Sequence, residues 1–334
     1  MKIDFQHLQH AHCESGATSN LFSHHGIALS EAMAFGIGAG IYFSHPFFIK
    51  AIGAPITSYR YFPGVVFKQT AKMLGADVEF KTFGSNKVKA TKALDNLLNQ
   101  GVPVGLITDI YYLNYLPEMF RFHFNAHNLI VYGKEKDRYL ISDSILEIPV
   151  AVDGESLARA RFGTGFMSTR GKMYHIKNLS AQVDLAPAIK EGIRLASNRI
   201  LNKPLPWAGI KGMHLLAERI KKYPKKLTPE QNTLYLSNIV RMQEVVGTGG
   251  SGYRFLYADF LKEAGEYLQS DALIKMASRM KDIAFRWREF ASKAARLAKS
   301  RSDSNFSHQD LGALLHQIAD LEKAFFTELK SIVK

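Results

Sequence analysis

The pattern of hydrophobic and polar residues divides the chain into two parts. In the first part, runs that alternate as strands do are interleaved with shorter helical runs. After His175 the strand patterns vanish, and long runs with a helical repeat continue to the end of the chain. We therefore predict a domain boundary near residue 180, with one domain at 1–180 and another at 181–334.

The first part reads as a mixed α+β domain. Predicted helices begin near Cys13, pass through LSEAMAFGIGAGIYF toward Ala54, and recur at 63–74 and 87–98, whereas predicted strands cover 77–83, 102–113, 127–136 and 138–144. The last two strands form a hairpin that turns near 134–137. The glycines at 36–40 follow no strand, so close helix packing explains them better than a dinucleotide fingerprint.

The second part is predicted to be all-α. Its helical repeats cover 186–201, 208–222, 228–246, 253–265, 271–299 and 307–333.

Composition limits the kind of protein this is. With 334 residues, 46% of them hydrophobic and 22% charged, the chain is long enough for two globular cores and too apolar to be disordered. A single cysteine excludes an internal disulfide framework. The first residues do not resemble a signal peptide, and the apolar stretch 27–54 is interrupted by Glu31, Pro46 and Lys50, so we expect a cytoplasmic protein without a membrane span.

The net charge of +13 predicts attraction to acidic partners, whether nucleic acid, anionic lipid or an acidic protein. The basic stretch at 286–301 favours a non-enzymatic binding protein as one hypothesis, under which Cys13→Ala would leave function intact. The chain has no helix-turn-helix, zinc-finger or RNA-binding aromatic signature. We therefore expect no nucleic-acid partner.

Cys13 is the first candidate for chemistry. A lone cysteine is usually a small buried hydrophobe, but a thiol where a helix begins meets unpaired N–H groups and the positive end of the helix dipole, which favour the reactive thiolate. Downstream, His127 opens one predicted strand and Asp143 ends the next. This order is expected of a papain-like triad in which His127 is the acid and base and Asp143 orients it.

The donors that would stabilise an oxyanion are less clear. Papain-like enzymes commonly carry a glutamine six residues before the cysteine, and here that position is His7. The main-chain N–H of Cys13 supplies one donor, and the candidates for the second are Gln6, Gln9 and Asn20. A rival use of the segment is zinc binding by His7, His10, His12 and Cys13, but no second ligand pair follows, so we predict no metal.

A glycine-rich segment, GTGGSGYRFLYADF, lies at 247–260 before a predicted helix. A helix start can receive an anion or a carbonyl, so Gly249, Gly250, Tyr253 and Arg254 are candidates for substrate binding. A linker between two helices is the alternative.

Three segments together resemble the butirosin biosynthesis protein H family: HCESGATSNLFSHHGIALSEAMAFGIGAGIYF, AHNLIVYG and GTGGSGYRFLYADF. The resemblance covers nearly the whole chain. It implies a papain-like N-terminal domain and a helical C-terminal domain. It also implies an acyltransferase that takes an acyl group from the phosphopantetheine thioester of an acyl carrier protein and passes it to an amine, in specialised-metabolite or lipid biosynthesis. Because a helical domain that closes over the cysteine would exclude water from such an acyl-enzyme, we assign 181–334 a lid and acceptor-binding role as a hypothesis.

Carried onto this sequence, the resemblance makes Cys13 the acyl acceptor, His127 the acid and base and Asp143 its orienter. The partners it implies are an acidic acyl carrier protein and a small amine, with no bound cofactor. A hydrolase with the same triad, either a peptidase or a thioesterase, stays open as the alternative. The sequence also leaves open whether the acceptor is an amine or a hydroxyl and whether the protein is a homodimer.

Overall fold

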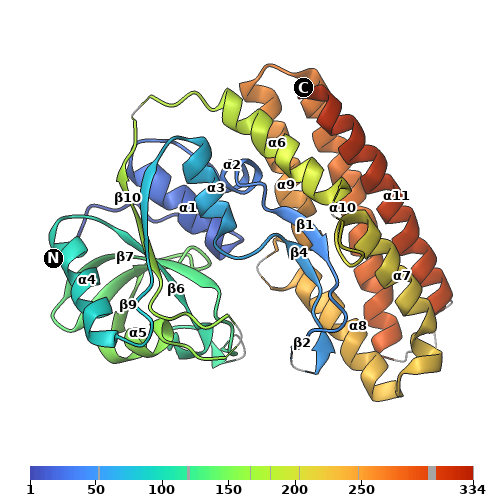
Figure 1. Ribbon diagram of the computed structural model, residues 1–334, viewed down its shortest axis with the longest axis horizontal. Helices are drawn as coiled ribbons and strands as arrows, with labels where there is room; N and C mark the ends of the chain where they lie inside the picture. Colours follow the sequence, from blue (N-terminus) through green and yellow to red (C-terminus); the bar gives the residue numbers. More distant parts are fainter. Residues whose placement is uncertain are drawn as a thin grey trace. The chain divides into compact units, whose positions relative to one another are not determined.

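The chain folds into two compact units. Figure 1 shows the chain coloured from its N-terminus to its C-terminus. The computed structural model describes residues 1–51, 53–118, 121–165, 167–180, 182–202, 204–246, 248–299 and 306–333. The first unit comprises Met1–Ala34 and Pro63–Leu185, and the second comprises Phe35–Phe62 and Ala186–Lys334. Residue 181, where the second domain was predicted to begin, and residues 300 and 301 of the basic stretch lie outside the described residues.

The observed division differs from the predicted one in a single segment. Residues 35–62 belong to the second unit, although the prediction placed them in the domain 1–180. The reason is local, because α2 (Glu31–Ile37) ends early and the chain then forms a strand, β1 (Ile41–Ser44), instead of continuing as a helix. Near its other end, the first unit runs to Leu185, close to the predicted boundary at 180.

The first unit is built on a six-stranded antiparallel sheet with the order β5-β10-β6-β7-β8-β9. Figure 1 labels β6, β7, β9 and β10 of this sheet. The strands are β5 (Asp77–Lys81), β6 (Val104–Thr108), β7 (His127–Glu135), β8 (Arg138–Ser142), β9 (Val150–Asp153) and β10 (Met173–Asn178). The hairpin between β7 and β8 is the predicted one. Strands β9, with four residues, and β10, with six, were not predicted, because each lies beside charged or polar residues.

Helices cover both faces of this sheet. They are α1 (Cys13–His24), α3 (Val65–Met73), α4 (Lys87–Asn99) and α5 (Gly154–Arg161), with a short 3-10 helix, η1 (Ile110–Tyr112). Leu106 on β6 and Leu129 on β7 are paired and share a buried cluster with Leu94 of α4. On the other face the Tyr174 ring lies 4.4 Å from the Phe67 ring of α3, measured between centroids. Both faces of the sheet are therefore buried, which is why its central strands are almost wholly apolar.

One edge of this sheet collects the ends of three strands. In an antiparallel sheet the end of one strand lies beside the start of the next. Thr108, the last residue of β6, pairs with His127, the first residue of β7, and Ser142, the last residue of β8, pairs with Ile130. Residues that follow β6, open β7 or follow β8 are therefore brought together in space.

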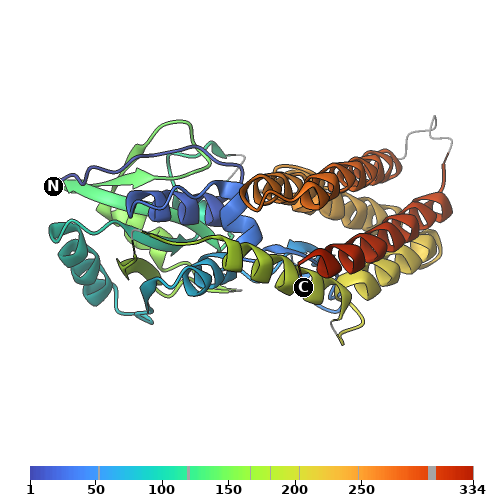
Figure 2. The same cartoon turned by 90° about the horizontal axis from the view of Figure 1, so that it is seen from above.

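The second unit is a helical assembly with a small amount of strand. Its helices are α6 (Ala186–Leu201), α7 (Gly209–Lys226), α8 (Pro229–Glu244), α9 (Arg254–Tyr267), α10 (Asp271–Ala298) and α11 (His308–Ile332), with η3 (Ser251–Tyr253) before α9. Its strands are β1, β2 (Lys50–Ala51), β3 (Ala54–Pro55) and β4 (Ser58–Arg60). Helix α7 packs along α11 and α9 packs along α10, as Figures 1 and 2 show.

The predicted fold class is confirmed: an α+β unit holds the sheet, and the described residues from 186 onward form helices. Within the described residues, no helix combines the length and the apolarity that crossing a membrane would take.

Candidate active site

Cys13 is the first residue of α1, and the turn before it is fixed by one carboxylate. Glu31 accepts hydrogen bonds from the main-chain N–H groups of Ala11 at 2.9 Å and His12 at 2.7 Å, and from the Ser15 hydroxyl at 3.0 Å. His12 has an extended backbone and its Nδ1 accepts from the Ser15 N–H, so it caps the helix. The sulfur is thereby held where the first helical N–H groups lack intrahelical acceptors.

Glu14, the next residue, fixes α1 from the other side. Its side chain is fully buried, and Oε1 accepts from the N–H of Val66 at 2.8 Å, in the first turn of α3. A carboxylate is well placed there because the start of a helix carries a partial positive charge. The reactive end of α1 is therefore tied to the scaffold through both neighbours of Cys13.

His127 and Asp143 meet at the sheet edge described above. His127 Nε2 lies 2.7 Å from Asp143 Oδ2, and both side chains are buried. The Cys13 side chain lies close enough to the same imidazole to raise its pKa. Since Nε2 is bonded to Asp143, Nδ1 is the ring nitrogen left to face the sulfur. The structure thus brings the predicted cysteine, histidine and aspartate together.

The electrostatics of this trio favour an ion pair. Burial lowers the pKa of His127, but the Asp143 carboxylate and the Cys13 side chain outweigh it and raise the pKa to about 10. At neutral pH the imidazole is therefore protonated beside the sulfur, which stabilises a thiolate. A thiolate held against an imidazolium is the nucleophile of papain-like chemistry.

Tyr115 is a fourth member of the site that the sequence analysis did not identify. Its hydroxyl donates to Asp143 Oδ2 at 2.6 Å, while the N–H of Ile145 donates to Oδ1 at 3.3 Å. Burial and the Asp143 charge raise the pKa of Tyr115 well above its ordinary value, so the phenol keeps its proton and remains a donor. No sequence signal marks this residue, because it lies in an irregular segment between β6 and β7.

The sequence matches two family models. The family model described as "Butirosin biosynthesis protein H, N-terminal" matches residues 12–144, which include the whole trio, and the model described as a domain of unknown function (DUF4872) matches residues 155–329, more than half of the chain. The chain belongs to the butirosin biosynthesis protein H family.

Other comparisons add less. No curated protein matches the chain. A crystal structure of a protein from Bacillus anthracis described as a C39-like peptidase is similar over 54% of this chain and 100% of its own, with 14% sequence identity and a TM-score of 0.37.

Of the three predicted side-chain donors for an oxyanion, Asn20 and Gln9 have other hydrogen-bond partners. Asn20 donates to the carbonyl of Leu8 at 3.0 Å and meets His10 at 2.9 Å, and it lies seven residues after Cys13, roughly 10 Å along the helix. The exposed Gln9 donates to the carbonyl of Ile145 at 3.5 Å. Gln6 is exposed. The main-chain N–H of Cys13, at the start of α1, remains the candidate donor.

The histidines near Cys13 have separate partners and do not converge. His7 lies 2.8 Å from the Ser142 hydroxyl, His10 lies against Asn20, and His12 contacts Ser15. In the part of the chain that the structure describes, no group of three or more His, Cys, Asp or Glu side chains could hold a metal ion. These contacts give the histidines a structural role in the segment that leads into α1.

The glycine-rich segment does not form the predicted substrate site. Arg254 is fully buried, with Nε 2.8 Å from Glu322 Oε1 and Nη2 3.0 Å from Glu322 Oε2, while Nη1 donates to the carbonyl of Gly252 at 2.7 Å. Tyr253 is buried against the Phe35 ring, 5.0 Å away between centroids. The substrate-binding prediction is therefore wrong for Arg254 and Tyr253.

Of the two glycines in that prediction, Gly250 is buried and only Gly249 is exposed. Both have positive φ, 63° at Gly249 and 90° at Gly250, which glycine adopts without strain. A Cβ at Gly250 would lie 2.3 Å from Nη2 of Arg288. These glycines serve the turn between α8 and α9.

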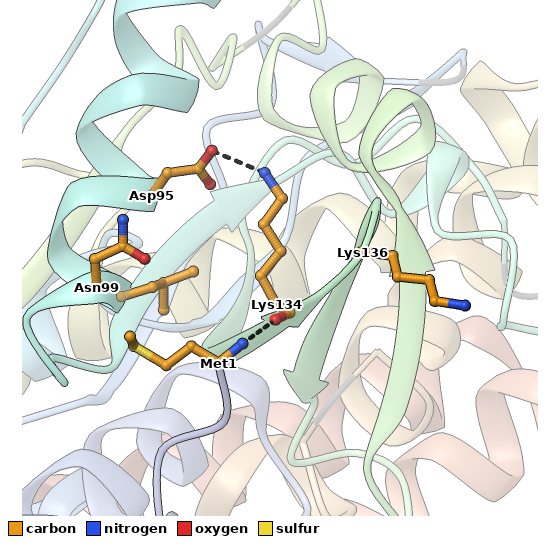
Figure 3. A pocket seen from close by; sticks show the side chains of 6 residues that line it. Met1, Asp95, Asn99, Lys134 and Lys136 are labelled. Atoms are coloured by element: carbon orange, nitrogen blue, oxygen red, sulfur yellow. Dashed lines mark hydrogen bonds and ion pairs between the residues drawn. The ribbon is translucent and has the colours of Figure 1, made fainter.

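A cavity of about 230 Å³ on the first unit lies away from the trio. Figure 3 shows the side chains that line it: Met1, Asp95, Leu98, Asn99, Lys134 and Lys136. In that view Lys134 points at Asp95, with Nζ 2.8 Å from Oδ2. Lys134 lies seven residues after His127 on β7, roughly 24 Å along an extended strand. The cavity is therefore not a substrate pocket for Cys13.

Proposed function

We propose that this protein is an acyltransferase in which Cys13 carries an acyl group as a thioester. The observation that carries the proposal is the Cys13–His127–Asp143 trio, with a protonated imidazole beside the sulfur. Membership of the butirosin biosynthesis protein H family supports transfer of an acyl group in a biosynthetic pathway, of specialised metabolites or of lipids.

In the first half of the reaction, the Cys13 thiolate attacks the carbonyl carbon of a donor thioester. The oxygen of the tetrahedral intermediate is stabilised by the main-chain N–H of Cys13. The carbon–sulfur bond to the donor then breaks, and the leaving thiolate takes the proton of the His127 imidazolium. The products are acyl-Cys13, neutral His127 and a free donor thiol.

In the second half, a neutral acceptor amine attacks the acyl-Cys13 carbonyl, the carbon–sulfur bond to Cys13 breaks, and an amide leaves. The N–H proton that the amine loses passes to the neutral His127, which restores the imidazolium beside the Cys13 thiolate. Exchange between two thioesters is nearly balanced in free energy, whereas an amide is more stable than a thioester. The overall transfer therefore runs downhill without ATP or another activating reagent.

The donor that fits best is the phosphopantetheine thioester of an acyl carrier protein. Such carriers are generally acidic, and this chain has 43 Lys and Arg against 30 Asp and Glu. Opposite net charges raise the rate of encounter and make it sensitive to salt. The same surface charge would also attract other polyanions, so it supports the donor without identifying it.

The test is a mass measurement on the intact protein. Wild type, Cys13→Ala and a control are incubated with carrier proteins that bear acetyl, octanoyl or aminoacyl groups, with and without added amines. The control is His316→Gln in α11 of the second unit, where the His316 side chain is 27% exposed and pairs with Glu218. We expect wild type and the control to gain one acyl group, Cys13→Ala to gain none, and an amine to discharge the adduct as an amide. Release of free acid without amide would favour the hydrolase instead, and no adduct from any donor would refute the proposal for those donors.

A further inference from the structure

A second His–Asp pair lies at the same sheet edge as the trio. Asp109 directly follows β6 and is fully buried, and its Oδ2 lies 2.8 Å from Nδ1 of His123. Its other oxygen, Oδ1, accepts from the N–H groups of Tyr111 and Phe124, both at 3.1 Å. The carboxylate is thus fixed by three donors, while the His123 side chain is 61% exposed.

The pair is connected to the trio through the backbone and through a side chain. Thr108, the residue before Asp109, pairs with His127, so the Cα atoms of Asp109 and His127 lie roughly 6 Å apart. Tyr115, from the segment between Asp109 and His123, donates to Asp143. The segment that carries His123 therefore starts at Asp109 and ends at His127, both at the active-site edge of the sheet, and Tyr115 attaches it to Asp143.

The geometry of His123 suits a base. Because Nδ1 faces the carboxylate, the neutral imidazole carries its proton there and leaves the Nε2 lone pair open to solvent. The Tyr111 ring stacks on the imidazole at 4.3 Å between centroids, which fixes its plane. Behind Asp109, a Cβ at Gly163 would lie 2.5 Å from the Asp109 Cβ, so the carboxylate is closely packed on that side.

A purely structural role explains less of this arrangement. Asp109 already ties the segment down through the N–H groups of Tyr111 and Phe124. An ion pair to an imidazole that is more than half exposed adds little stability. By contrast, His45 in the second unit is a structural histidine, since it is fully buried and burial lowers its pKa to about 3.

The proposed reaction needs a second base. An alkylamine is an ammonium ion at neutral pH, so its nitrogen must lose one proton before it can attack and another as the amide forms. His127 has only Nδ1 facing the sulfur, because Nε2 is held by Asp143, and it accepts one proton when it returns to the imidazolium form. The first proton of the ammonium ion needs another acceptor.

We propose that His123, held by Asp109, takes the first proton from a cationic amine acceptor. The ammonium N–H bond breaks and the proton moves to Nε2 of His123. The neutral amine then attacks the acyl-Cys13 carbonyl carbon, the carbon–sulfur bond breaks, and the second proton goes to His127. This step restores the imidazolium and thiolate pair, and His123 returns its proton to water. The assignment rests on the acyltransferase function proposed above.

The test separates deacylation from acylation. Cys13 is loaded chemically with p-nitrophenyl acetate, so that the identity of the natural donor does not matter. The acetyl-enzyme is then discharged with butylamine, which is cationic at neutral pH, or with hydroxylamine, which is uncharged there. The variants are His123→Gln, Asp109→Asn and the control His316→Gln, and intact mass reports the acetyl group on Cys13.

In His123→Gln we expect butylamine discharge at neutral pH to be about 10²-fold slower than in wild type, within the range for general base catalysis. Discharge by hydroxylamine and acetylation of Cys13 should stay within twofold. Asp109→Asn should show the same selective loss, because an amide nitrogen facing Nδ1 would favour the tautomer with its proton on Nε2. The deficit should shrink as the pH rises and butylamine becomes neutral.

Each other result has a distinct meaning. Equal butylamine rates in wild type and His123→Gln would overturn the role of His123 and leave the acyltransferase proposal intact. Equal losses with butylamine and hydroxylamine would also overturn it, since they would indicate a disturbed site. A wild-type protein that p-nitrophenyl acetate does not acylate on Cys13 would overturn the acyltransferase proposal, and the role of His123 with it.

Discussion

Replacing Asp143 with asparagine removes the negative charge that raises the pKa of His127 against the lowering effect of burial. In the wild type the pKa of His127 is raised from 6.5 to about 10, which corresponds to roughly 5 kcal/mol in favour of the imidazolium. Without the carboxylate, burial would disfavour the imidazolium, and the Cys13 side chain would be the remaining group that favours it. Because an amide keeps one hydrogen bond to Nε2, we expect part of that free energy to be lost.

The imidazolium that faces the sulfur should therefore be depleted in Asp143→Asn, and alkylation of Cys13 at neutral pH should slow by about 10²-fold. The readout is the rate of alkylation by iodoacetamide as a function of pH. Cys13 is the only cysteine in the chain, so every alkylation event reports on this sulfur. Wild type should react faster than Asp143→Asn at neutral pH, and the difference should narrow as the pH rises toward 10, where the wild-type imidazole also loses its proton.

The free energy of unfolding should also differ between wild type and Asp143→Asn, and the difference should depend on pH. A group whose pKa is raised on folding contributes stability that is fully present below its unfolded value, here 6.5, and is lost as the pH rises through about 10. The deficit of Asp143→Asn in urea denaturation should thus be largest below pH 6.5 and shrink toward pH 10. Superimposable alkylation profiles for the two proteins would refute the ion-pair reasoning.

Further predictions concern the scaffold, the orienter and the donor. Glu322→Ala leaves the Arg254 guanidinium buried without its partner, so it should lower the free energy of unfolding by about 3–5 kcal/mol in urea denaturation; an unchanged midpoint would contradict the buried ion pair. Tyr115→Phe removes a hydrogen bond to the Asp143 carboxylate and should slow acetylation of Cys13 by p-nitrophenyl acetate about tenfold. An unchanged rate would show that Tyr115 does not help to position Asp143. Added salt should slow acylation by an acidic carrier protein but not by p-nitrophenyl acetate, and equal salt effects would exclude charge steering.

The helices of the second unit could be predicted because each carries its own signals. The repeat predicted at 186–201 coincides with α6 (Ala186–Leu201). Two helix starts carry capping boxes, Thr228 with Gln231 and Ser307 with Asp310, in which side chain and backbone satisfy each other's donors. Such signals are local, so no knowledge of the packing is needed to find these helices.

The strand β1 could not be predicted, because the helix before it ends without the usual glycine at its left-handed position. The N–H of Gly40 bonds to the carbonyl of Phe35 and the N–H of Ala39 bonds to the carbonyl of Gly36, which is the Schellman motif that ends a helix. Its left-handed position is Ala39, with φ 48°, although glycine is usual there. The hydrophobic pattern keeps a helical period through 36–43, so the sequence predicts a continued helix where the backbone becomes extended.

The trio was readable because strand order encodes it. A histidine that opens one strand and an aspartate that follows the next must meet at one edge of an antiparallel hairpin, whatever the rest of the fold does. Tyr115 and the His123–Asp109 pair depend instead on the path of an irregular segment, for which no periodicity exists. Their partners became visible only when that segment was placed against the sheet.

Arg254 shows a different kind of failure, in which the chemistry was anticipated but its partner was not. Positive φ at Gly252 and Tyr253 turns the chain sharply before α9, as the glycines suggested, and Arg254 does bind an anion. That anion is Glu322 of α11, 68 residues away in sequence, which also accepts from the Trp287 indole at 2.6 Å. A buried guanidinium needs a charge and hydrogen bonds to offset its lost hydration, and only the fold reveals whether a substrate or the chain itself supplies them.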